Sequence, residues 1–286
     1  MISAIAPAKL NLFLRVCDKT SSGHHRLDSV VSFTEFGDRV MITPAREDKL
    51  TATGSFAQML DATNGAGVNN LVMRALHAFR ESGGDVGSVS VTLEKNIPVG
   101  AGLGGGSSDA ATFLRLINDP ENGLTKKTLC NSVINHIARN LGADVPVCLA
   151  GTSKRIAGIG ETLTDFSVTA CPVLLVNPMK PLSTAAVFSH FDGPFSGSAG
   201  KIVTRNAARL CLYGNDLQAT AIELMPEIDR GLQHLGALSG CVASAMSGSG
   251  ASCFGIFSTQ QSCENSAKKM QEIGFWAVPT QIKTNN

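Results

Sequence analysis

The sequence predicts an α+β protein, in which strands and helices follow one another without a regular strand–helix–strand repeat. Three observations support this class. Polar and apolar residues alternate near the N-terminus, which is typical of a strand. Apolar residues recur at helical spacing over 70–80 and 129–141. Short apolar segments separated by small residues, which are typical of strands, occupy the last third of the chain.

The first half of the chain is predicted to begin with a strand. Every second residue from Leu10 to Val16 is apolar and points to one face, whereas Lys9 and Asn11 share the opposite face. The other elements predicted in this half are, in order, a turn at 21–23, a helix at 70–80, a strand at 89–93, a glycine loop from 98 and a helix over 110–117.

The second half alternates shorter elements. Its predicted elements are, in order, a helix at 129–141 closed by Gly142, a strand at 172–176, a loop at 196–200, strands at 241–246 and 251–257 joined by 247–250, a helix at 260–273 and a strand at 275–282. A glycine-rich stretch between 150 and 170 marks a domain boundary, so we expect domains over 1–160 and 161–286.

Composition excludes several classes of protein. The chain has 286 residues, is 43% hydrophobic and carries a formal net charge of +1. A near-neutral chain has no electrostatic reason to bind nucleic acid or an anionic membrane. No apolar run approaches the ~20 residues needed to span a bilayer, and the first residues do not resemble a signal peptide. A cytoplasmic location is expected.

Cysteine and histidine spacing indicates no transition-metal site. The eight cysteines include no C-x-x-C pair, and the six histidines include no H-E-x-x-H. Most of the cysteines lie in apolar surroundings, as buried free thiols do. Neither a zinc site nor a disulfide framework is expected.

The run PVGAGLGGGSSDAA, residues 98–111, is the most informative segment. Five glycines fall within seven residues and lead directly into a helix. A glycine loop at a helix start presents unpaired N–H groups and the positive end of the helix dipole, which suits a phosphate. The alternative is a flexible turn, but the predicted strand before the loop and the helix after it favour an anion site.

Three kinds of phosphate loop are possible. The Walker-type loop is excluded because no lysine follows the glycines. The dinucleotide pattern G-x-G-x-x-G is formally met by Gly100, Gly102 and Gly105. In that fold, however, the strand runs straight into the first glycine, whereas Pro98 interrupts here. The third kind is the nucleotide loop of the small-molecule kinases.

Residues 98–111 strongly resemble the loop P-x-G-x-G-L-G-S/G-S-S/G-x-A-x of the superfamily of galactokinase, homoserine kinase, mevalonate kinase and phosphomevalonate kinase (GHMP kinases). The resemblance implies a two-domain fold, with an N-terminal ATP-binding domain like domain 2 of ribosomal protein S5 and a ferredoxin-like C-terminal domain that helps to bind substrate. Two further blocks, 6–16 with 23–28 and 141–146 with 158–161, resemble the branch that phosphorylates cytidine diphosphate methylerythritol in the non-mevalonate isoprenoid route.

The resemblance implies two catalytic residues. Asp144 would take the proton from the substrate hydroxyl, and Lys9 would hold that hydroxyl and the transferring phosphoryl group. The chemistry is consistent, because a hydroxyl needs a nearby base as its oxygen attacks phosphorus. An ammonium beside the carboxylate keeps it ionised and offsets charge on the transferring oxygens. Without the resemblance, Lys9 and Asn11 would be interpreted as an exposed strand face, and Asp144 as a helix cap or turn residue.

Further site residues follow from the same resemblance. Residues expected at ATP are Pro98, Val99, Gly100, Ala101, Gly102, Leu103, Gly104, Gly105, Gly106, Ser107 and Ser108, with Asn70 and Lys95 bordering the adenine pocket. Residues expected at the substrate are Asn11, His24, His25, Thr184, Phe188, Gly248, Ser249 and Gly250. Magnesium is expected with ATP. Asp109 should either face away from the phosphates or meet them through magnesium.

His24 departs from the family pattern. The family has an aromatic residue, usually Tyr, at this position, where it stacks on cytosine. An imidazole is also flat, but it offers less area and can gain charge near neutral pH. His25 is expected to read the base, and Phe188 to cover its other face.

Three other functions remain open at this point. A sister kinase of the same superfamily would act on homoserine or a mevalonate phosphate. A non-catalytic protein on the same scaffold would bind ATP without turning over an acceptor, although such a protein would not need both Lys9 and Asp144. The last of the three is a dinucleotide-binding oxidoreductase.

Overall fold

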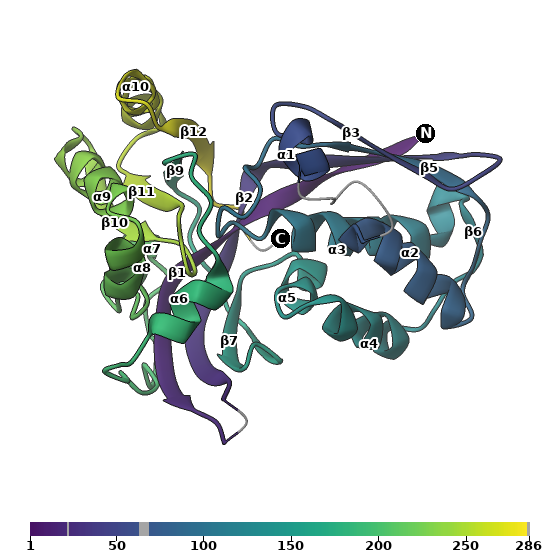
Figure 1. Cartoon of the computed structure of the whole chain (residues 1–286), viewed down its shortest axis with the longest axis horizontal. Helices are drawn as coiled ribbons and strands as arrows, with labels where there is room; N and C mark the ends of the chain where they lie inside the picture. Colours follow the sequence, from purple (N-terminus) through teal and green to yellow (C-terminus); the bar gives the residue numbers. More distant parts are fainter. Residues whose placement is uncertain (22, 63–68, 285–286) are drawn as a thin grey trace. The chain divides into compact units, whose positions relative to one another are not determined.

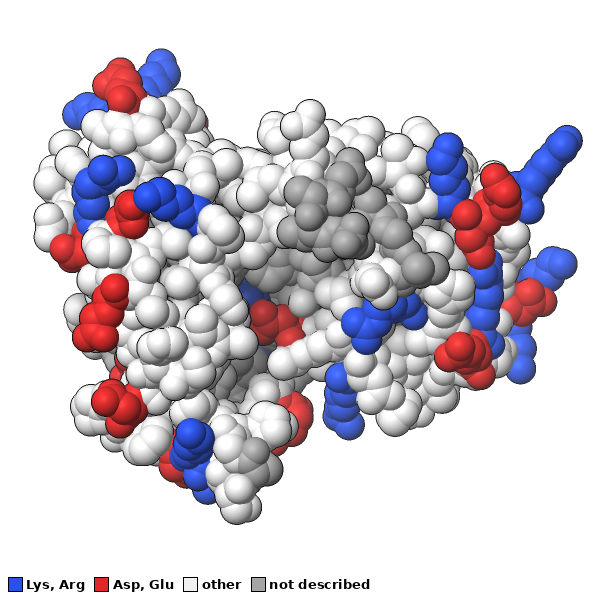
Figure 2. All heavy atoms as spheres, viewed as in Figure 1, with Lys and Arg blue, Asp and Glu red and all other residues white. Residues whose placement is uncertain are grey.

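The computed structural model describes residues 1–21, 23–62 and 69–284 and contains both helices and strands, which confirms the α+β class (Figure 1). None of the helices formed by these residues is long and apolar enough to cross a membrane. Acidic and basic side chains are interspersed over the face shown in Figure 2, as expected for a chain of nearly zero net charge.

The chain forms two compact units that alternate along the sequence. The first unit contains 1–8, 36–99 and 104–151, and the second contains 9–35, 100–103 and 152–286. The long strands β1 (Ile2–Lys19) and β2 (His25–Pro44) each contribute residues to both units. The predicted domains 1–160 and 161–286 are continuous segments. The division into 1–160 and 161–286 remains a prediction, whereas the two compact units of the structure each combine several separate segments of the chain.

In the first unit, the second half of β2 pairs antiparallel with β5 (Val89–Glu94), and β5 pairs in parallel with β3 (Lys49–Thr53). Helices α2, α3, α4 and α5 pack against one another. They bury large side chains such as Phe79 and Phe113. The remaining elements are α1 (Ala57–Ala62), α2 (Leu71–Glu81), β4 (Asp85–Val86), α3 (Gly105–Asn118), η1 (Pro120–Asn122), β6 (Thr125–Lys127), α4 (Asn131–Leu141) and α5 (Val145–Ala150).

In the second unit, the first half of β2 pairs with β7 (Lys154–Gly158), which pairs with β8 (Thr162–Asp165). A separate antiparallel sheet has the order β10-β11-β9-β12. Its strands and the helices of the unit are β9 (Pro172–Asn177), α6 (Thr184–His190), α7 (Ala207–Cys211), α8 (Gln218–Leu224), α9 (Glu227–Ala237), β10 (Cys241–Met246), β11 (Cys253–Phe257), α10 (Gln260–Glu272) and β12 (Trp276–Gln281).

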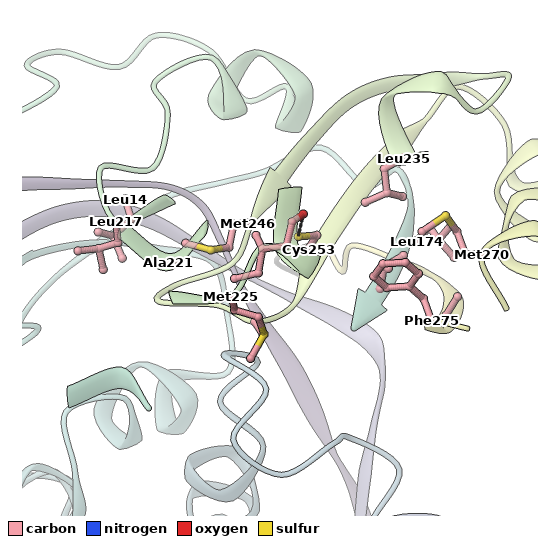
Figure 3. Packing of buried hydrophobic residues seen from close by; sticks show 14 of the residues in the cluster. Leu14, Leu174, Leu217, Ala221, Met225, Leu235, Met246, Cys253, Met270 and Phe275 are labelled. Carbon is pink, nitrogen blue, oxygen red and sulfur yellow. Dashed lines mark hydrogen bonds between the residues drawn. The ribbon is translucent and has the colours of Figure 1, made fainter. Parts of the chain in front are cut away.

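The core of the second unit lies between this four-stranded sheet and its helices. Leu174 from β9, Leu235 from α9 and Met270 from α10 point toward the ring of Phe275 (Figure 3). All four side chains are buried. Burial of apolar area of this kind stabilises the unit by about 25 cal/mol per Å². The turn between β10 and β11, residues 247–252, joins two strands of this sheet and belongs to the site described below.

Most predicted elements are confirmed, with ends shifted by a few residues. The helix after the glycine loop begins at Gly105 rather than at Ala110, because the last glycines of the run themselves form its first turn. The second strand of the C-terminal pair begins at Cys253, not Ala251. Residues 196–200 form neither helix nor strand, as predicted. The predicted turn at 21–23 includes residue 22, which lies outside the described residues.

Candidate active site

The first part of the glycine run, residues 100–103, lies against the turn between β10 and β11. The Ser252 N–H donates to the carbonyl of Ala101 at 3.0 Å, and the Ser247 hydroxyl donates to the carbonyl of Gly102 at 3.2 Å. Gly102 has φ +74°, and a Cβ built there would lie 2.3 Å from the carbonyl oxygen of Gly250. Only glycine allows this approach. The structure thus brings together two glycine motifs that are about half the chain apart.

Lys9 is joined to the same loop through its backbone. Its N–H donates to the carbonyl of Leu103 at 2.8 Å, and its ammonium donates to Oδ1 of Asn11 at 2.8 Å. The side-chain amide of Asn11 donates to the Ser29 hydroxyl at 2.9 Å, and its backbone N–H donates to the Ser247 hydroxyl at 3.2 Å. Lys9 and Asn11 share one strand face, as predicted. Both are buried, so this face is not the exposed strand side that the pattern alone would suggest.

The second part of the run opens helix α3. Gly104 stands at the N-cap with φ 65°, and the first intrahelical bond runs from the Ser108 N–H to the carbonyl of Gly104 at 2.8 Å. The N–H groups of 105–107 precede that bond and therefore have no acceptor within the helix. The Ser108 hydroxyl is buried and has no hydrogen-bond partner. This helix start is suited to an anion by its free amides, its dipole and its hydroxyl.

The other residues of the run differ in exposure along the loop. Pro98, Ala101 and Leu103 are buried, whereas Gly100 and Gly106 are exposed. A Cβ built on Gly100 would meet no atom within 4 Å. The loop therefore anchors itself through its apolar residues and presents bare backbone elsewhere. Val99 and Ser107 are intermediate in exposure.

Asp144 precedes the first residue of α5. The side chain makes no capping hydrogen bond, although the backbone carbonyl accepts from the N–H of Cys148 at 3.1 Å. The residue is half-buried. Capping, the ordinary role of an aspartate at this position, is therefore not what this carboxylate does. Asp144 belongs to the first unit and Lys9 to the second.

Asn70 and Lys95, which were predicted to border the adenine pocket, both have protein partners. Asn70 caps α2 by accepting from the Val72 N–H at 2.9 Å. The Lys95 ammonium is buried and pairs with the carboxylates of Asp38 and Asp109. Lys95 therefore contacts these two carboxylates, and any effect on a nucleotide would be exerted through them. The direction of Asp109 is also settled, since its carboxylate faces Lys95 in the protein interior.

The predicted substrate residues of the second unit include an aromatic group around His25. Its ring centroid lies 5.4 Å from that of Phe188 with an interplanar angle of 30°, and 5.8 Å from that of Phe191. Phe195 lies 6.4 Å from the same ring. Nε2 of His25 is buried without a hydrogen-bond partner. Burial, followed by the nearby charge of Lys19, lowers the pKa of His25, so its ring is neutral at pH 7.

His24 is exposed, and its backbone N–H and carbonyl both bond to Thr20. Thr184 begins α6, and its hydroxyl lies 2.8 Å from that of Ser249 in the glycine turn. A Cβ on Gly248 would lie 3.3 Å from Oδ1 of Asn11. Thr184, Asn11 and the turn 248–250 therefore meet in one place within the second unit.

Several residues that hold these groups were missed by the sequence interpretation. Asn215 donates to the carbonyls of Met246 and Gly248 at 2.9 and 2.8 Å and so holds the glycine turn. Asp28 accepts two bonds from Arg155 and one from the Ala199 N–H at 2.7 Å, which fastens the 196–200 loop. Despite the burial of its carboxylate, these donors lower the pKa of Asp28. Their partners lie far away in the chain, so no local pattern marks them.

Comparisons with known proteins show the family of the chain. Family models described as the N-terminal and C-terminal domains of GHMP kinases match residues 70–152 and 196–274. The chain is 39% identical over 291 residues to the 4-diphosphocytidyl-2-C-methyl-D-erythritol kinase of Brucella abortus, with 98% of this chain and 94% of that relative covered.

Solved structures show the same relationship. A 4-(cytidine 5'-diphospho)-2C-methyl-D-erythritol kinase superposes with a TM-score of 0.82 and 29% identity, covering 99% of this chain and 100% of that one. A homoserine kinase from Cytophaga hutchinsonii has a TM-score of 0.66 at 15% identity, covering 99% and 95%, which is a likeness of fold alone. The two-domain GHMP kinase fold predicted from the sequence is confirmed. The chain therefore belongs to the GHMP kinase family, in the branch whose members are named 4-diphosphocytidyl-2-C-methyl-D-erythritol kinase.

Proposed function

We propose that this protein transfers the γ-phosphoryl group of ATP to a hydroxyl on the methylerythritol part of 4-diphosphocytidyl-2-C-methyl-D-erythritol, giving the 2-phosphate and ADP in the non-mevalonate route to isoprenoids. The relatives at 39% identity carry the name of this activity. One structural observation carries the proposal. Lys9, the proposed charged partner of the reaction, is bonded through its own backbone to the glycine loop.

The glycine run is the proposed cradle for the nucleotide phosphates. The amides that open α3, the bare backbone at Gly100 and the unpartnered hydroxyl of Ser108 all suit a polyanion. The remaining residues of 98–108 shape the loop. Asn70 and Lys95 are proposed to border the adenine pocket. They act there as positioning residues, because both side chains already bond to protein groups.

Magnesium fits this site as an ion that accompanies the triphosphate. Among residues 1–21, 23–62 and 69–284, no group of three or more His, Cys, Asp or Glu is arranged to hold a metal ion. Mg²⁺ typically binds substrate phosphates, water and only one or two carboxylates, so no larger cluster is required. When bound, it offsets charge on the phosphate oxygens.

The proposed chemistry uses Asp144 and Lys9. The Asp144 carboxylate accepts the proton of the substrate hydroxyl. The freed oxygen forms a bond to the γ-phosphorus, and the bond from that phosphorus to the β–γ bridging oxygen breaks, which leaves ADP. The Lys9 ammonium offsets charge on the transferring oxygens. Most of the acceleration comes from positioning and electrostatics, because phosphoryl transfer asks little covalent chemistry of the protein.

The cytidine is proposed to bind at the aromatic group around His25. The neutral ring can accept or donate one hydrogen bond at Nε2, which has no partner within the protein. Phe188 supplies an apolar face beside it. His24, Asn11, Thr184 and the turn 248–250 complete the proposed substrate site. All eight cysteines are free thiols, which suits a cytoplasmic enzyme.

A panel of acceptors tests the proposed function. The purified protein should release ADP with 4-diphosphocytidyl-2-C-methyl-D-erythritol and show at least ~100-fold lower kcat/KM with homoserine or phosphomevalonate, because neither can fill the cytidine site. ADP release is followed by a coupled assay, with ATP alone as the blank. Equal or better turnover of homoserine or phosphomevalonate would assign the chain to a sister activity. Nucleotide binding without turnover of any acceptor would make it a non-catalytic binder.

Substitution His25→Ala should raise KM for the cytidylyl substrate by about tenfold or more. The substrate would lose its partner at Nε2, and an unpaired polar group in a buried site costs about 1–3 kcal/mol. The KM for ATP should stay within about twofold of the wild-type value. His234→Ala, which removes an exposed imidazole on α9, is the matched control. An unchanged KM for the cytidylyl substrate would remove His25 from base recognition.

A further inference from the structure

Three buried charges lie beneath the start of the glycine loop. Asp38 comes from β2, Lys95 follows β5, and Asp109 lies in α3. The side chains are 0%, 3% and 2% exposed. The Lys95 ammonium contacts Oδ2 of Asp38 and Oδ2 of Asp109, the latter at 2.6 Å. All three residues belong to the first unit.

The charges of this cluster do not balance. Two carboxylates face one ammonium, which leaves one negative charge if both acids are ionised. An unpaired buried charge is costly, so a proton on one acid stabilises the cluster. Oδ1 of Asp109 is the oxygen left for that proton, because it is buried and has no hydrogen-bond partner.

The pKa directions agree with this count. Burial raises the pKa of Asp109 to about 7, with the Lys95 ammonium acting against the rise and the Asp38 carboxylate adding to it. Burial also acts against the Lys95 ammonium, but the two carboxylates outweigh it and raise its pKa. Lys95 therefore stays charged at neutral pH, and the exchangeable proton belongs to the acids.

The cluster holds both flanks of the glycine loop. Oδ1 of Asp38 accepts from the N–H groups of Asn96 and Ile97 at 2.6 and 2.8 Å, directly before Pro98. A Cβ built on Gly105 would lie 3.3 Å from Oδ2 of Asp38, so this carboxylate also sits against the first residue of α3. Asp109 lies one turn further along the same helix.

We propose that Asp38, Lys95 and Asp109 are positioning residues for the nucleotide, and that this cluster takes up a proton when the nucleotide phosphates bind. The inference rests on the proposed function, which places a triphosphate at the start of α3. Added negative charge at that helix start disfavours a net negative charge on the neighbouring cluster, of which Asp109 lies in the same helix. Nucleotide binding and protonation of the cluster are then linked, and each favours the other.

In the described part of the elements packed on α3, the charged groups are paired elsewhere or exposed. The residues that α2 buries are apolar, and its charged Arg80 pairs with Asp48. On α5 the titratable group is Cys148, and on η1 it is the exposed Glu121. On β5, Glu94 pairs with Arg39. The remaining titratable groups of α2 are Arg74 and His77, which are exposed, and Glu81 at its end.

Calorimetry with Mg·ADP tests the linkage. Wild-type protein should bind Mg·ADP with net proton uptake near pH 7.5, measured as a heat that differs between PIPES and Tris buffers. Its Kd should rise by about three- to tenfold from pH 6 to pH 8.5, since one unit of pKa change corresponds to about tenfold in affinity. The pH profile of KM for ATP should follow Kd, with no matching change in kcat.

Asp109→Asn is the informative variant. The amide oxygen can still accept from Lys95, while the side chain stays neutral at every pH and so imitates the protonated acid. This variant should lose most of the proton uptake and keep, at pH 8.5, the Kd that wild type shows at pH 6. Asp48→Asn is the matched control, because it removes a carboxylate of the same unit that pairs with Arg80 outside the cluster. It should retain wild-type proton uptake.

The outcomes separate this inference from the proposed function. Equal proton uptake by wild type and Asp109→Asn, or a wild-type Kd that does not change from pH 6 to 8.5, would overturn the linkage. Failure of wild type to bind Mg·ADP at any pH would instead overturn the nucleotide site itself.

Stability provides a second readout, because folded Asp109 binds a proton more tightly than unfolded Asp109. Its stabilising contribution is present below pH ~3.8 and lost as pH rises toward 7, and Asp109→Asn should abolish that slope.

Discussion

Substitution Asp144→Asn is expected to lower kcat by about 10²- to 10⁴-fold, which is the usual contribution of a positioned general base. An amide cannot accept the hydroxyl proton, but it has nearly the same size as the carboxylate. The side chain does not cap α5, so its loss should leave the helix start intact. The measurement is steady-state ADP release with the cytidylyl substrate, together with Kd for Mg·ADP by calorimetry.

The same change at Asp85, an exposed residue of β4, is the control for Asp144→Asn. It should leave kcat within about twofold of wild type, since surface substitutions away from special features have small effects. An Asp144→Asn variant that retains near-full phosphoryl transfer would show that the base lies elsewhere. A fall in Mg·ADP affinity equal to the fall in kcat/KM would instead assign Asp144 to nucleotide binding.

Substitution Gly102→Ala is expected to lower the free energy of unfolding by about 2–5 kcal/mol and to abolish tight nucleotide binding. Two costs add. A left-handed conformation costs an L-residue about 1–2 kcal/mol. Overpacking costs about 1–3 kcal/mol more, because the added Cβ would lie 2.3 Å from the carbonyl oxygen of Gly250. Equilibrium urea unfolding and Mg·ADP titration measure the two effects.

Gly100→Ala is a closely matched comparison for Gly102→Ala. Gly100 has a similar φ of +68°, but a Cβ there would meet no atom within 4 Å. Its cost should be confined to the backbone, about 1–2 kcal/mol. If both variants lost the same stability, the contact between the loop and the 247–252 turn would contribute nothing. A larger loss for Gly102→Ala would establish that this contact holds the loop.

Local patterns were sufficient for elements whose signal lies within a few residues. The spacing over 70–80 and 129–141 predicted α2 and α4, and the Pro98–Ala111 run predicted a loop followed by a helix. The long strand β2 was missed because residues 28–34 are buried without interruption, so no polar alternation marks them. The start of α3 was placed too late because glycine is a poor helix former, and only tertiary packing keeps it helical there.

The order of residues along the chain was sufficient for the kinase family and for a proposal of the site residues, because glycines at a fixed spacing and the blocks around Lys9 and Asp144 can be recognised without knowing what they contact. The tertiary structure decided which distant groups meet. Asp38 is 57 residues from Lys95 and Asn215 is 31 residues from Met246, and no periodicity links such positions. Burial then determines charge. An aspartate in water is ionised at neutral pH, whereas burial raises the pKa of Asp109 to about 7.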